Sequence, residues 1–260
     1  MQDDYGNVTL VNVSGIYDEQ PLFIDKLKKG GAGVIDAVSM TGTNGYCDDM
    51  AKENFREMMK EYPTKGIHFI DGGNYHYLTL LWLSLIEELF DLIVFDNHSD
   101  MQKPAFGDVL SCGGWIRNLV EDSGFKGKVT VVGVDKDNID KEMKELGVKF
   151  ITKQTILKKR GQQYGLENEL IDKCWTGKRP VYISVDKDVL DEKEYKTNWN
   201  QGIMSVDELF AIIEDTFEMR KVIGMDICGE MDEAVNSEFG SIYNEINQAV
   251  NMRFLKFRIS

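Results

Sequence analysis

Histidine, cysteine and proline are scarce in this sequence, whose 260 residues include only 3, 4 and 4 of them. The cysteines lie far apart and form no C-x-x-C pair; they are Cys47, Cys112, Cys174 and Cys228. This spacing excludes a disulfide framework and a thiolate zinc ribbon, and it predicts reduced, mostly buried thiols in a cytoplasmic protein. With so few prolines and no low-complexity segment to mark a linker, we expect a single domain that spans residues 1–260.

Long apolar runs and positive charge are also lacking. No run approaches the length of a membrane span and no signal-peptide pattern occurs, so we expect no membrane partner. Lys and Arg total 30 against 44 Asp and Glu, which gives a formal net charge of −14. Such a charge repels phosphate backbones and anionic lipid, which argues against nucleic-acid binding. An acidic surface suits a small cationic ligand, although keeping a protein in solution is its more ordinary role.

Short, continuous apolar runs rich in β-branched residues recur along the chain. Such runs are typical of strands that are covered on both faces. Helical patterns lie between them, and this alternation predicts an α/β protein with a mainly parallel sheet and helices on both faces. The expected strands are Val8–Val13, Gly33–Val38, Ile67–Ile70, Leu92–Phe95, Val129–Val134, Val148–Ile151, Val181–Val185 and Val222–Met225.

The helical segments carry recognisable boundary signals. Ser205 begins a capping box, and Tyr77–Phe90 is expected to form an apolar helix against the sheet. Asn138 is expected to cap a short helix that Gly147 terminates. A further helix follows the capping pair Asp48-Asp49. Its expected apolar face consists of Met50, Phe55, Met58 and Met59.

Residues that commonly bind metals follow three of the expected strands, at the carboxyl ends where open parallel sheets bind ligands. Residues two apart in an extended chain point the same way. The side chains of Asp96, His98 and Asp100 should therefore converge, as should those of Asp186 and Asp188, while Lys187 points elsewhere. A pair of glycines lets the third segment turn its histidine into the same crevice. The three segments are Asp96-Asn97-His98-Ser99-Asp100, Asp186-Lys187-Asp188 and Asp71-Gly72-Gly73-Asn74-Tyr75-His76.

Buried carboxylates and imidazoles in one crevice are costly without a compensating cation, so the pattern predicts a pair of divalent metal ions. The oxygen-rich ligand set suits Mn²⁺, while Zn²⁺ and Fe²⁺ remain open. Each motif alone has an ordinary explanation: a polar loop, a solvated turn, or a helix cap at His76. Their equivalent positions at three strand ends favour the metal site.

Together these motifs resemble those of the ureohydrolase family, which includes arginase, agmatinase and formiminoglutamase and has the marks G-G-D-H, D-A-H-x-D and S-x-D-x-D-x-x-D-P. The resemblance implies a divergent member with a three-layer αβα, arginase/deacetylase-like fold, an eight-stranded sheet, two Mn²⁺ ions and a homo-oligomeric assembly. It implies one ion on His76, Asp96, Asp100 and Asp186, and a second on His98, Asp96, Asp186 and Asp188.

The resemblance also implies a reaction. Two cations share one water, lower its pKa and present hydroxide to the carbon of a guanidino or formimino group. Asp188 would then accept the proton and pass it to the leaving nitrogen. The family places a substrate-binding Glu in D-x-x-E after a late strand; here Glu230 is the candidate, one position later than that spacing. Gln102 lies where the family contacts the far end of its small cationic substrate.

The sequence departs from the family pattern at several positions. Asn74 and Tyr75 interrupt the glycine motif, and no histidine follows position 100 to shuttle protons. Ser111 and Cys112 occupy that stretch, and Cys112 is a candidate acid–base group if a nearby cation lowers its pKa. These departures keep two alternatives open: a deacetylase-like amidohydrolase with one metal, and a non-catalytic metal-binding protein. A site blocked by Tyr75 or Trp115 would favour the latter.

Overall fold

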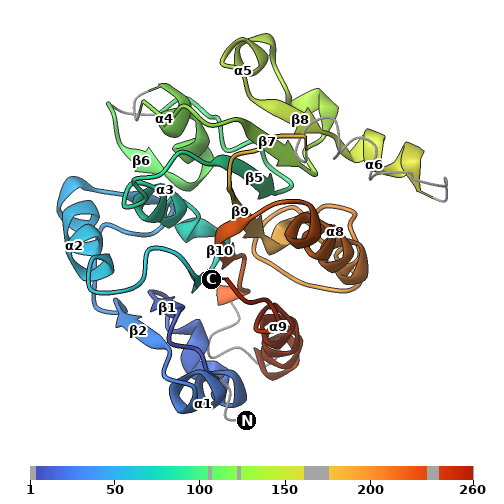
Figure 1. Cartoon of the computed structure of the whole chain (residues 1–260). Coiled ribbons are helices and arrows are strands. Elements are labelled where there is room, and N and C mark those ends of the chain that lie inside the picture. Colours follow the sequence, from blue (N-terminus) through green and yellow to red (C-terminus); the bar gives the residue numbers. More distant parts are fainter. Residues whose placement is uncertain (1–3, 105–106, 122–123, 161–175, 233–239, 260) are drawn as a thin grey trace.

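All eight strands of the main sheet are parallel, in the order β2-β1-β4-β10-β9-β5-β7-β8 (Figure 1). The computed structural model describes residues 4–104, 107–121, 124–160, 176–232 and 240–259. Each expected run overlaps one of these strands, so the predicted α/β class is confirmed. The strands are β1 (Val8–Asn12), β2 (Gly33–Asp36), β4 (Ile67–Phe69), β5 (Asp91–Phe95), β7 (Val129–Val132), β8 (Lys149–Ile151), β9 (Val181–Asp186) and β10 (Val222–Cys228).

Helices cover both faces of the sheet and produce two separate apolar cores, which completes the three-layer αβα arrangement. Alternate residues of one strand enter opposite cores: Leu92 and Val94 of β5 enter one, and Ile93 and Phe95 enter the other. The first core is covered by α2 (Asp49–Met59), α3 (Leu78–Leu83), α4 (Trp115–Glu121) and α5 (Lys141–Glu145). The second is covered by α1 (Pro21–Lys29), α6 (Lys153–Lys159), α8 (Val206–Met219) and α9 (Gly240–Phe254).

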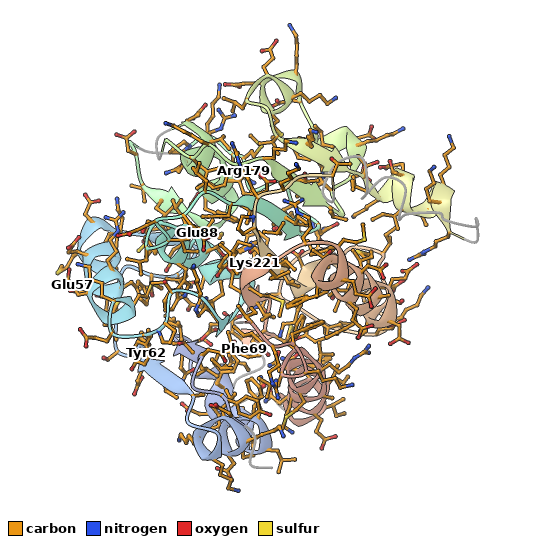
Figure 2. The ribbon with its side chains drawn as sticks, in the orientation of Figure 1. Glu57, Tyr62, Phe69, Glu88, Arg179 and Lys221 are labelled. Carbon is orange, nitrogen blue, oxygen red and sulfur yellow. The ribbon has the colours of Figure 1, made fainter. Side chains whose placement is uncertain are left out.

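The interior matches the expectation from apolar runs. Phe69 of β4 lies in the middle of the molecule, whereas Glu57 of α2 lies at its edge (Figure 2). His68, between the apolar residues of β4, is fully buried and stacks on Trp82 with ring centroids 4.0 Å apart. Both its ring nitrogens have partners, Tyr182 Oη and the Pro63 carbonyl, and burial lowers its pKa to about 4. His68 is therefore a satisfied core histidine.

Several helix boundaries differ from those expected. The segment Tyr77–Phe90 is helical only over α3, because Ser84 Oγ donates to the Leu81 carbonyl and the chain then leaves the helix. Asp140, rather than Asn138, caps α5 by accepting from the Met143 amide. Gly147 follows this helix with φ 83°, as expected of a helix stop.

The face of α2 is also partly different from the prediction. Asp48 caps this helix by accepting from the Ala51 amide. Phe55 and Met59 are buried, but Met50 is 73% exposed because it lies in the first turn, on the side away from the core. The expectation for Met50 was therefore wrong.

A second, two-stranded sheet has no counterpart in the sequence analysis. In it β3 (Tyr46–Cys47) pairs antiparallel with β6 (Leu110–Ser111), so that Tyr46 lies opposite Ser111. Strands of two residues carry no periodicity that a sequence pattern can detect. This sheet matters because it forms a wall of the cavity described below.

Among the described residues, no helix combines the length and apolarity that crossing a membrane requires. Cys47 and Cys228 are buried, Cys112 is partly buried, and all three are free thiols. Cys174 lies outside the described residues.

The capping box at the start of α8 gives a first test of how this fold is stabilised. Ser205 Oγ accepts from the Glu208 amide, and the Glu208 carboxylate accepts from the Ser205 amide. Replacing Ser205 with Ala should lower the free energy of unfolding by about 1 kcal/mol, because both bonds are lost or weakened at the helix start. Urea denaturation measures the change. Ser205→Thr, which keeps the capping oxygen, should lose less than half as much; equal losses would contradict the capping account.

Candidate metal centre

The carboxyl ends of β4, β5 and β9 bring the three predicted motifs to one edge of the sheet. β5 and β9 are direct neighbours, and β10 separates β9 from β4. Asp96 follows β5, Asp186 is the last residue of β9, and a 3-10 turn over Gly73–Tyr75 carries His76 from β4 toward them. The structure therefore brings together all six residues for which metal binding is expected, and it does so through adjacent parallel strands.

One cluster surrounds the His76 ring. Its Nδ1 lies 2.9 Å from Asp100 Oδ2, 3.2 Å from Asp96 Oδ2 and 3.6 Å from Asp186 Oδ2. All four side chains are buried. Asp100 adopts φ 49°, a left-handed conformation that is uncommon for a residue other than glycine and that persists only where the surroundings enforce it.

A second cluster surrounds His98 and shares Asp96 with the first. His98 Nδ1 lies 2.8 Å from Asp188 Oδ2 and 3.5 Å from Asp96 Oδ1. The donor atoms of Asp96, His98 and Asp188 all lie within 4.8 Å of one another, as do those of His76, Asp96 and Asp100. Two adjacent groups with a common carboxylate are the arrangement that a pair of cations requires.

The chemistry of these residues fits divalent cations. His76 Nδ1 and Asp96 Oδ2 are buried and lie 3.2 Å apart, but neither makes a hydrogen bond of acceptable geometry among the described residues, which is costly unless a cation satisfies them. The pKa of His98 reflects the same excess of negative charge. Burial opposes its protonation, but hydrogen bonds to Asp188 and Asp96 outweigh that effect and raise its pKa to about 11. Cations bound among these carboxylates would take the place of those protons.

The ligand residues are oriented by a surrounding set of hydrogen bonds. His76 Nε2 lies 2.9 Å from Ser184 Oγ, which in turn donates to Asp226 Oδ1 at 2.6 Å. Trp115 Nε1 donates to Asp100 Oδ2 at 2.6 Å. Such partners fix the ring tautomer and the position of each carboxylate before any ion binds.

Sequence analysis missed part of this support. Ser184 precedes Asp186 by two residues on β9 and therefore points to the same side, and Asp226 is its register partner on β10. The alternation of side chains along β9 could therefore have identified Ser184 from the sequence. Cys228, the register partner of Asp186, was expected only to be a buried thiol; its Sγ donates to Asp186 Oδ2 at 3.2 Å.

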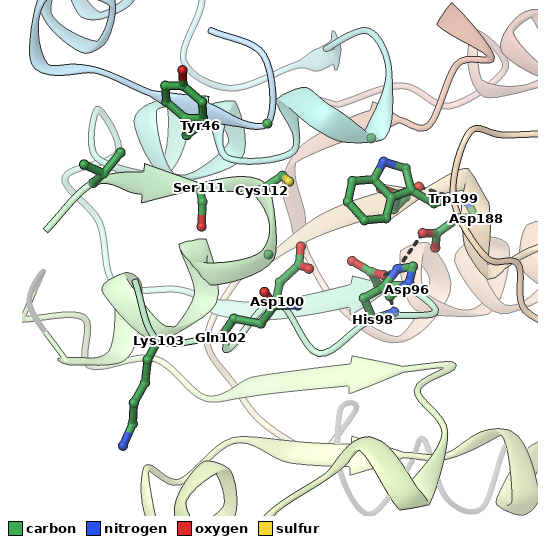
Figure 3. Close-up of a pocket in the computed structure, with 15 residues that line it drawn as sticks. Tyr46, Asp96, His98, Asp100, Gln102, Lys103, Ser111, Cys112, Asp188 and Trp199 are labelled. Atoms are coloured by element: carbon green, nitrogen blue, oxygen red, sulfur yellow. Dashed lines mark hydrogen bonds and ion pairs between the residues drawn. The ribbon is translucent and has the colours of Figure 1, made fainter. Parts of the chain in front are cut away.

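The irregular glycine motif has a structural reason. A Cβ atom on Gly73 would lie 2.9 Å from the Trp199 ring and 3.1 Å from Asp186 Oδ2, so this position requires glycine. Asn74 Oδ1 accepts from Trp199 Nε1 at 3.1 Å. The residues between the glycines and His76 therefore hold the Trp199 ring in place beside His98 (Figure 3).

A cavity of about 490 Å³ opens above the two clusters (Figure 3). Asp96, His98, Asp100, Asp186 and Asp188 form its acidic end. Its other lining residues are Gly45, Tyr46, Gly73, Gln102, Lys103, Val109, Ser111, Cys112, Gly113 and Trp199. Both Gln102 and Cys112 thus lie where a substrate would be within reach, whereas Tyr75 and Trp115 do not line the cavity and do not block it.

Cys112 does not have the properties of a reactive thiolate. Burial, followed by the negative charge of Asp100, raises the pKa of its thiol to about 12. The described residues around it therefore favour the protonated thiol near neutral pH, and a role of Cys112 as an acid–base group beside a bound cation stays a prediction. It can still donate a weak hydrogen bond into the cavity.

Glu230 is not where the sequence analysis expected it. Its carboxylate is buried away from the cavity lining and accepts from Lys187 Nζ, Gln20 Nε2 and Asn251 Nδ2. The position given by the D-x-x-E spacing is Gly229, whose φ of 89° favours glycine. The expected substrate contact of Glu230 is therefore corrected: it serves a buried ion pair instead.

Lys187 is the partner in that pair and points away from the metal ligands on either side of it, as the alternation predicts. Its side chain is fully buried, donates to Asn251 Oδ1 at 3.1 Å, and lies 5.0 Å from the centroid of the Tyr195 ring. A buried lysine is rare unless it is paired, so Lys187 in the D-K-D motif was a signal for a buried acid elsewhere.

The fold and this site together define a three-layer α/β protein with a candidate metal centre, and comparison with known proteins identifies its family. The model of the arginase family matches residues 24–231. The chain therefore belongs to the arginase family.

The relatives compared here by sequence and structure are distant. An uncharacterized protein of Thermotoga maritima is 29% identical over 227 residues, which cover 87% of this chain and 80% of the relative. The formimidoylglutamase of Bacillus subtilis has a TM-score of 0.68 at 17% identity, with 98% of this chain and 90% of that chain covered. The formiminoglutamase of Trypanosoma cruzi with Mn²⁺ has a TM-score of 0.67 at 13% identity, with 98% and 94% covered. At these identities the solved structures establish the shared fold.

Metal-dependent stability should change with pH. Burial and the neighbouring carboxylates raise the pKa of Asp186 to about 7 and that of Asp188 to about 6. A carboxylate with a raised pKa stabilises the fold below its unfolded pKa of about 3.9, and this contribution is lost as pH rises through the folded pKa. The metal-free protein should therefore lose stability between about pH 4 and pH 7, and added Mn²⁺ should stabilise it more at pH 8 than at pH 5.5.

Thermal unfolding in chelator and in excess Mn²⁺ measures this difference. The gain in Tm should be greater at pH 8 by at least about 4 °C, which corresponds to about 1–2 kcal/mol in a protein of this size. A gain that is equal at the two pH values would contradict the metal account of this site.

The Lys187–Glu230 pair allows a second test. Replacing either residue alone, as Lys187→Met or Glu230→Gln, leaves the other buried without its partner and should cost about 3–5 kcal/mol of unfolding free energy. The double variant should be more stable than the sum of the two losses predicts, by about 1–3 kcal/mol, because the residues are in direct contact. Additive losses in urea denaturation would show that the pair is not coupled.

Proposed function

We propose that this protein is a two-metal hydrolase that cleaves a C–N bond of a small guanidino or amidine-type compound. The observation that carries the proposal is the pair of ligand clusters that share Asp96 and lie at the end of an open cavity. Membership of the arginase family supports the same class of reaction. The formiminoglutamase of Trypanosoma cruzi, solved with Mn²⁺, supports this metal for the present chain.

In this proposal, the first ion is held by His76, Asp96, Asp100 and Asp186, and the second by Asp96, His98, Asp186 and Asp188. The donors are four carboxylates and two imidazoles, a set that Mn²⁺ accepts readily and that also accommodates Zn²⁺ or Fe²⁺. When bound, such a pair supplies Lewis-acid chemistry: it lowers the pKa of water and polarises the substrate carbon.

Asp188 is the residue we propose to move the proton. Its Oδ2 faces His98, and its Oδ1 accepts from the Asn97 amide at 3.0 Å, so the carboxylate is fixed from both sides. Fixed in this way beside the proposed ions, the carboxylate is positioned to accept a proton and to return it. Oδ2 takes the proton of the attacking water and passes it to the leaving nitrogen.

The proton path beyond Asp188 differs from the one that the arginases use. Ser111 and Cys112 line the cavity in the stretch where those enzymes have a histidine. Since the pKa of Cys112 is raised to about 12, we propose that it remains a hydrogen-bond donor and that Asp188 alone carries the proton.

We keep cytoplasmic location and homo-oligomeric assembly as predictions.

The alternatives from sequence fit the geometry less well. A deacetylase-like amidohydrolase with one metal leaves the second cluster, at His98, without a role. For a non-catalytic protein a closed site would be expected, but Tyr75 and Trp115 are buried outside the cavity lining. Both observations favour the two-metal hydrolase.

A panel of guanidines, formimino compounds and amides, incubated with the Mn²⁺-loaded protein, tests the proposal. We expect about two Mn²⁺ ions per chain, and urea or ammonia released from at least one amidine compound. Asp188→Asn should reduce kcat by at least about 100-fold, because the proton acceptor is lost.

The exposed residue Glu192 provides the control, since Glu192→Gln should keep kcat within about twofold. Absence of product from every compound at full metal occupancy would overturn the proposed reaction. Release of acetate alone, with one ion per chain, would favour the deacetylase-like alternative.

A further inference from the structure

Three large apolar side chains line the cavity although they remain partly exposed. Trp199 is 40% exposed and lies beside the proposed metal ligand His98, whereas Tyr46 and Val109, 54% and 41% exposed, line the cavity from the β3–β6 side. We refer to these three side chains as the apolar mouth. Large apolar side chains that remain exposed around one opening usually contact a ligand, because water is a poor partner for them.

The cavity is larger than the reacting group alone requires. At about 490 Å³ it falls within the range of about 300–1,000 Å³ that holds drug-sized ligands. An amidine group bound at Asp188 would fill only part of this cavity. The rest of the substrate, which we call its tail, would occupy the remaining space along the apolar mouth.

Trp199 is held rigidly despite its exposure. Its Nε1 donates to Asn74 Oδ1 at 3.1 Å, and its ring meets the His98 ring nearly edge to face, with centroids 5.6 Å apart. Gly73 lies so close beneath it that a Cβ atom there would be 2.9 Å from the indole. A fixed aromatic surface binds an apolar group with little loss of conformational entropy.

Tyr46 and Val109 approach the cavity from the β3–β6 side. Tyr46 belongs to β3 and pairs with Ser111 of β6, while Val109 directly precedes β6. The short sheet therefore places an aromatic ring and an aliphatic side chain on a common support. Ser111 and Gln102 add neutral polar groups to the same lining.

The described residues in this part of the cavity offer almost no charge to a substrate tail. Among the described lining residues other than the proposed metal ligands, Lys103 is the only charged one. Its side chain is 67% exposed, its Nζ lies 2.9 Å from Glu142 Oε2, and Figure 3 shows it extending away from Asp96 and His98. A charged tail, whether a carboxylate or an ammonium, would lose its hydration here without gaining a buried partner.

From these observations we infer that the substrate carries an uncharged, apolar or aromatic tail, which packs against Trp199, Tyr46 and Val109. The inference rests on the proposed function for the reacting group and adds the class of compound that is selected. Burying one aromatic ring in such a site is expected to raise kcat/KM by about 10–100-fold over a substrate without a tail.

Four guanidines that differ only in their tails test this inference with the Mn²⁺-loaded protein. They are methylguanidine without a tail, 2-phenylethylguanidine with an aromatic tail, agmatine with a cationic tail and 4-guanidinobutyrate with an anionic tail. We expect kcat/KM to be highest for 2-phenylethylguanidine, at least about 10-fold above each of the others. An equal or higher value for either charged compound would overturn the inference.

Two variants connect the preference to the apolar mouth. Trp199→Ala should lower kcat/KM for 2-phenylethylguanidine at least about 10-fold more than it lowers that for methylguanidine. Trp199→Phe, which keeps an aromatic ring, should retain most of the preference. Met219→Ala, which removes an exposed apolar side chain of α8 outside the cavity, should leave it unchanged. Equal losses for both substrates in Trp199→Ala would contradict a role in tail selection.

Calorimetric titration of the same four compounds distinguishes failure of this inference from failure of the proposed reaction. If none is hydrolysed, the proposed reaction fails, yet tighter binding of 2-phenylethylguanidine than of agmatine would still support the apolar mouth. If hydrolysis occurs but agmatine or 4-guanidinobutyrate binds as tightly, the reaction stands and the inference fails.

Discussion

Repulsion among buried carboxylates is the constraint on which the rest of this structure depends. Asp96, Asp186 and Asp188 lie at the ends of two neighbouring parallel strands, so the sheet itself forces them together. Burial removes the water that would otherwise screen their charges. The raised pKa values of Asp186 and Asp188 express the same cost, and it can be offset by bound protons or bound cations. At neutral pH such an arrangement calls for a compensating positive charge, which the proposed cations would supply.

Polar residues on the opposite side of the Asp186-Lys187-Asp188 segment form a separate, neutral ion pair. Alternation along the chain directs Asp186 and Asp188 toward the cavity and Lys187 to the opposite side, where Glu230 neutralises it. The charge of the ligand side can therefore change as metal or protons bind, while the Lys187–Glu230 side remains neutral. This separation lets one three-residue segment serve both the site and the stability of the fold.

The sequence was sufficient to predict the strands of the main sheet and the convergence of the first motif. Continuous apolar runs located all the strands of the main sheet, and spacing by two residues correctly grouped Asp96 with Asp100. Features that depend on tertiary contacts could not be read in this way. The apolar stretch after Ser84 looks helical, but a side-chain hydrogen bond ends α3 early, and the β3–β6 pairing joins segments that lie more than sixty residues apart. Glu230 was misplaced because its partner, Lys187, becomes a neighbour only once β9 and β10 pair.

The residues at the end of β10 explain why substrate recognition would depend on the tail. A Cβ atom on Gly229 would lie 2.6 Å from Asp186 Oδ1 and 2.7 Å from the Lys187 amide nitrogen, so no side chain can occupy the position that the D-x-x-E spacing assigns to a substrate-binding carboxylate. The next residue, Glu230, is already committed to Lys187. Neither Gly229 nor Glu230 at this strand end can therefore offer a carboxylate to an amidinium group. Discrimination between substrates then falls to contacts with the tail, and on the described side of the cavity those contacts are apolar.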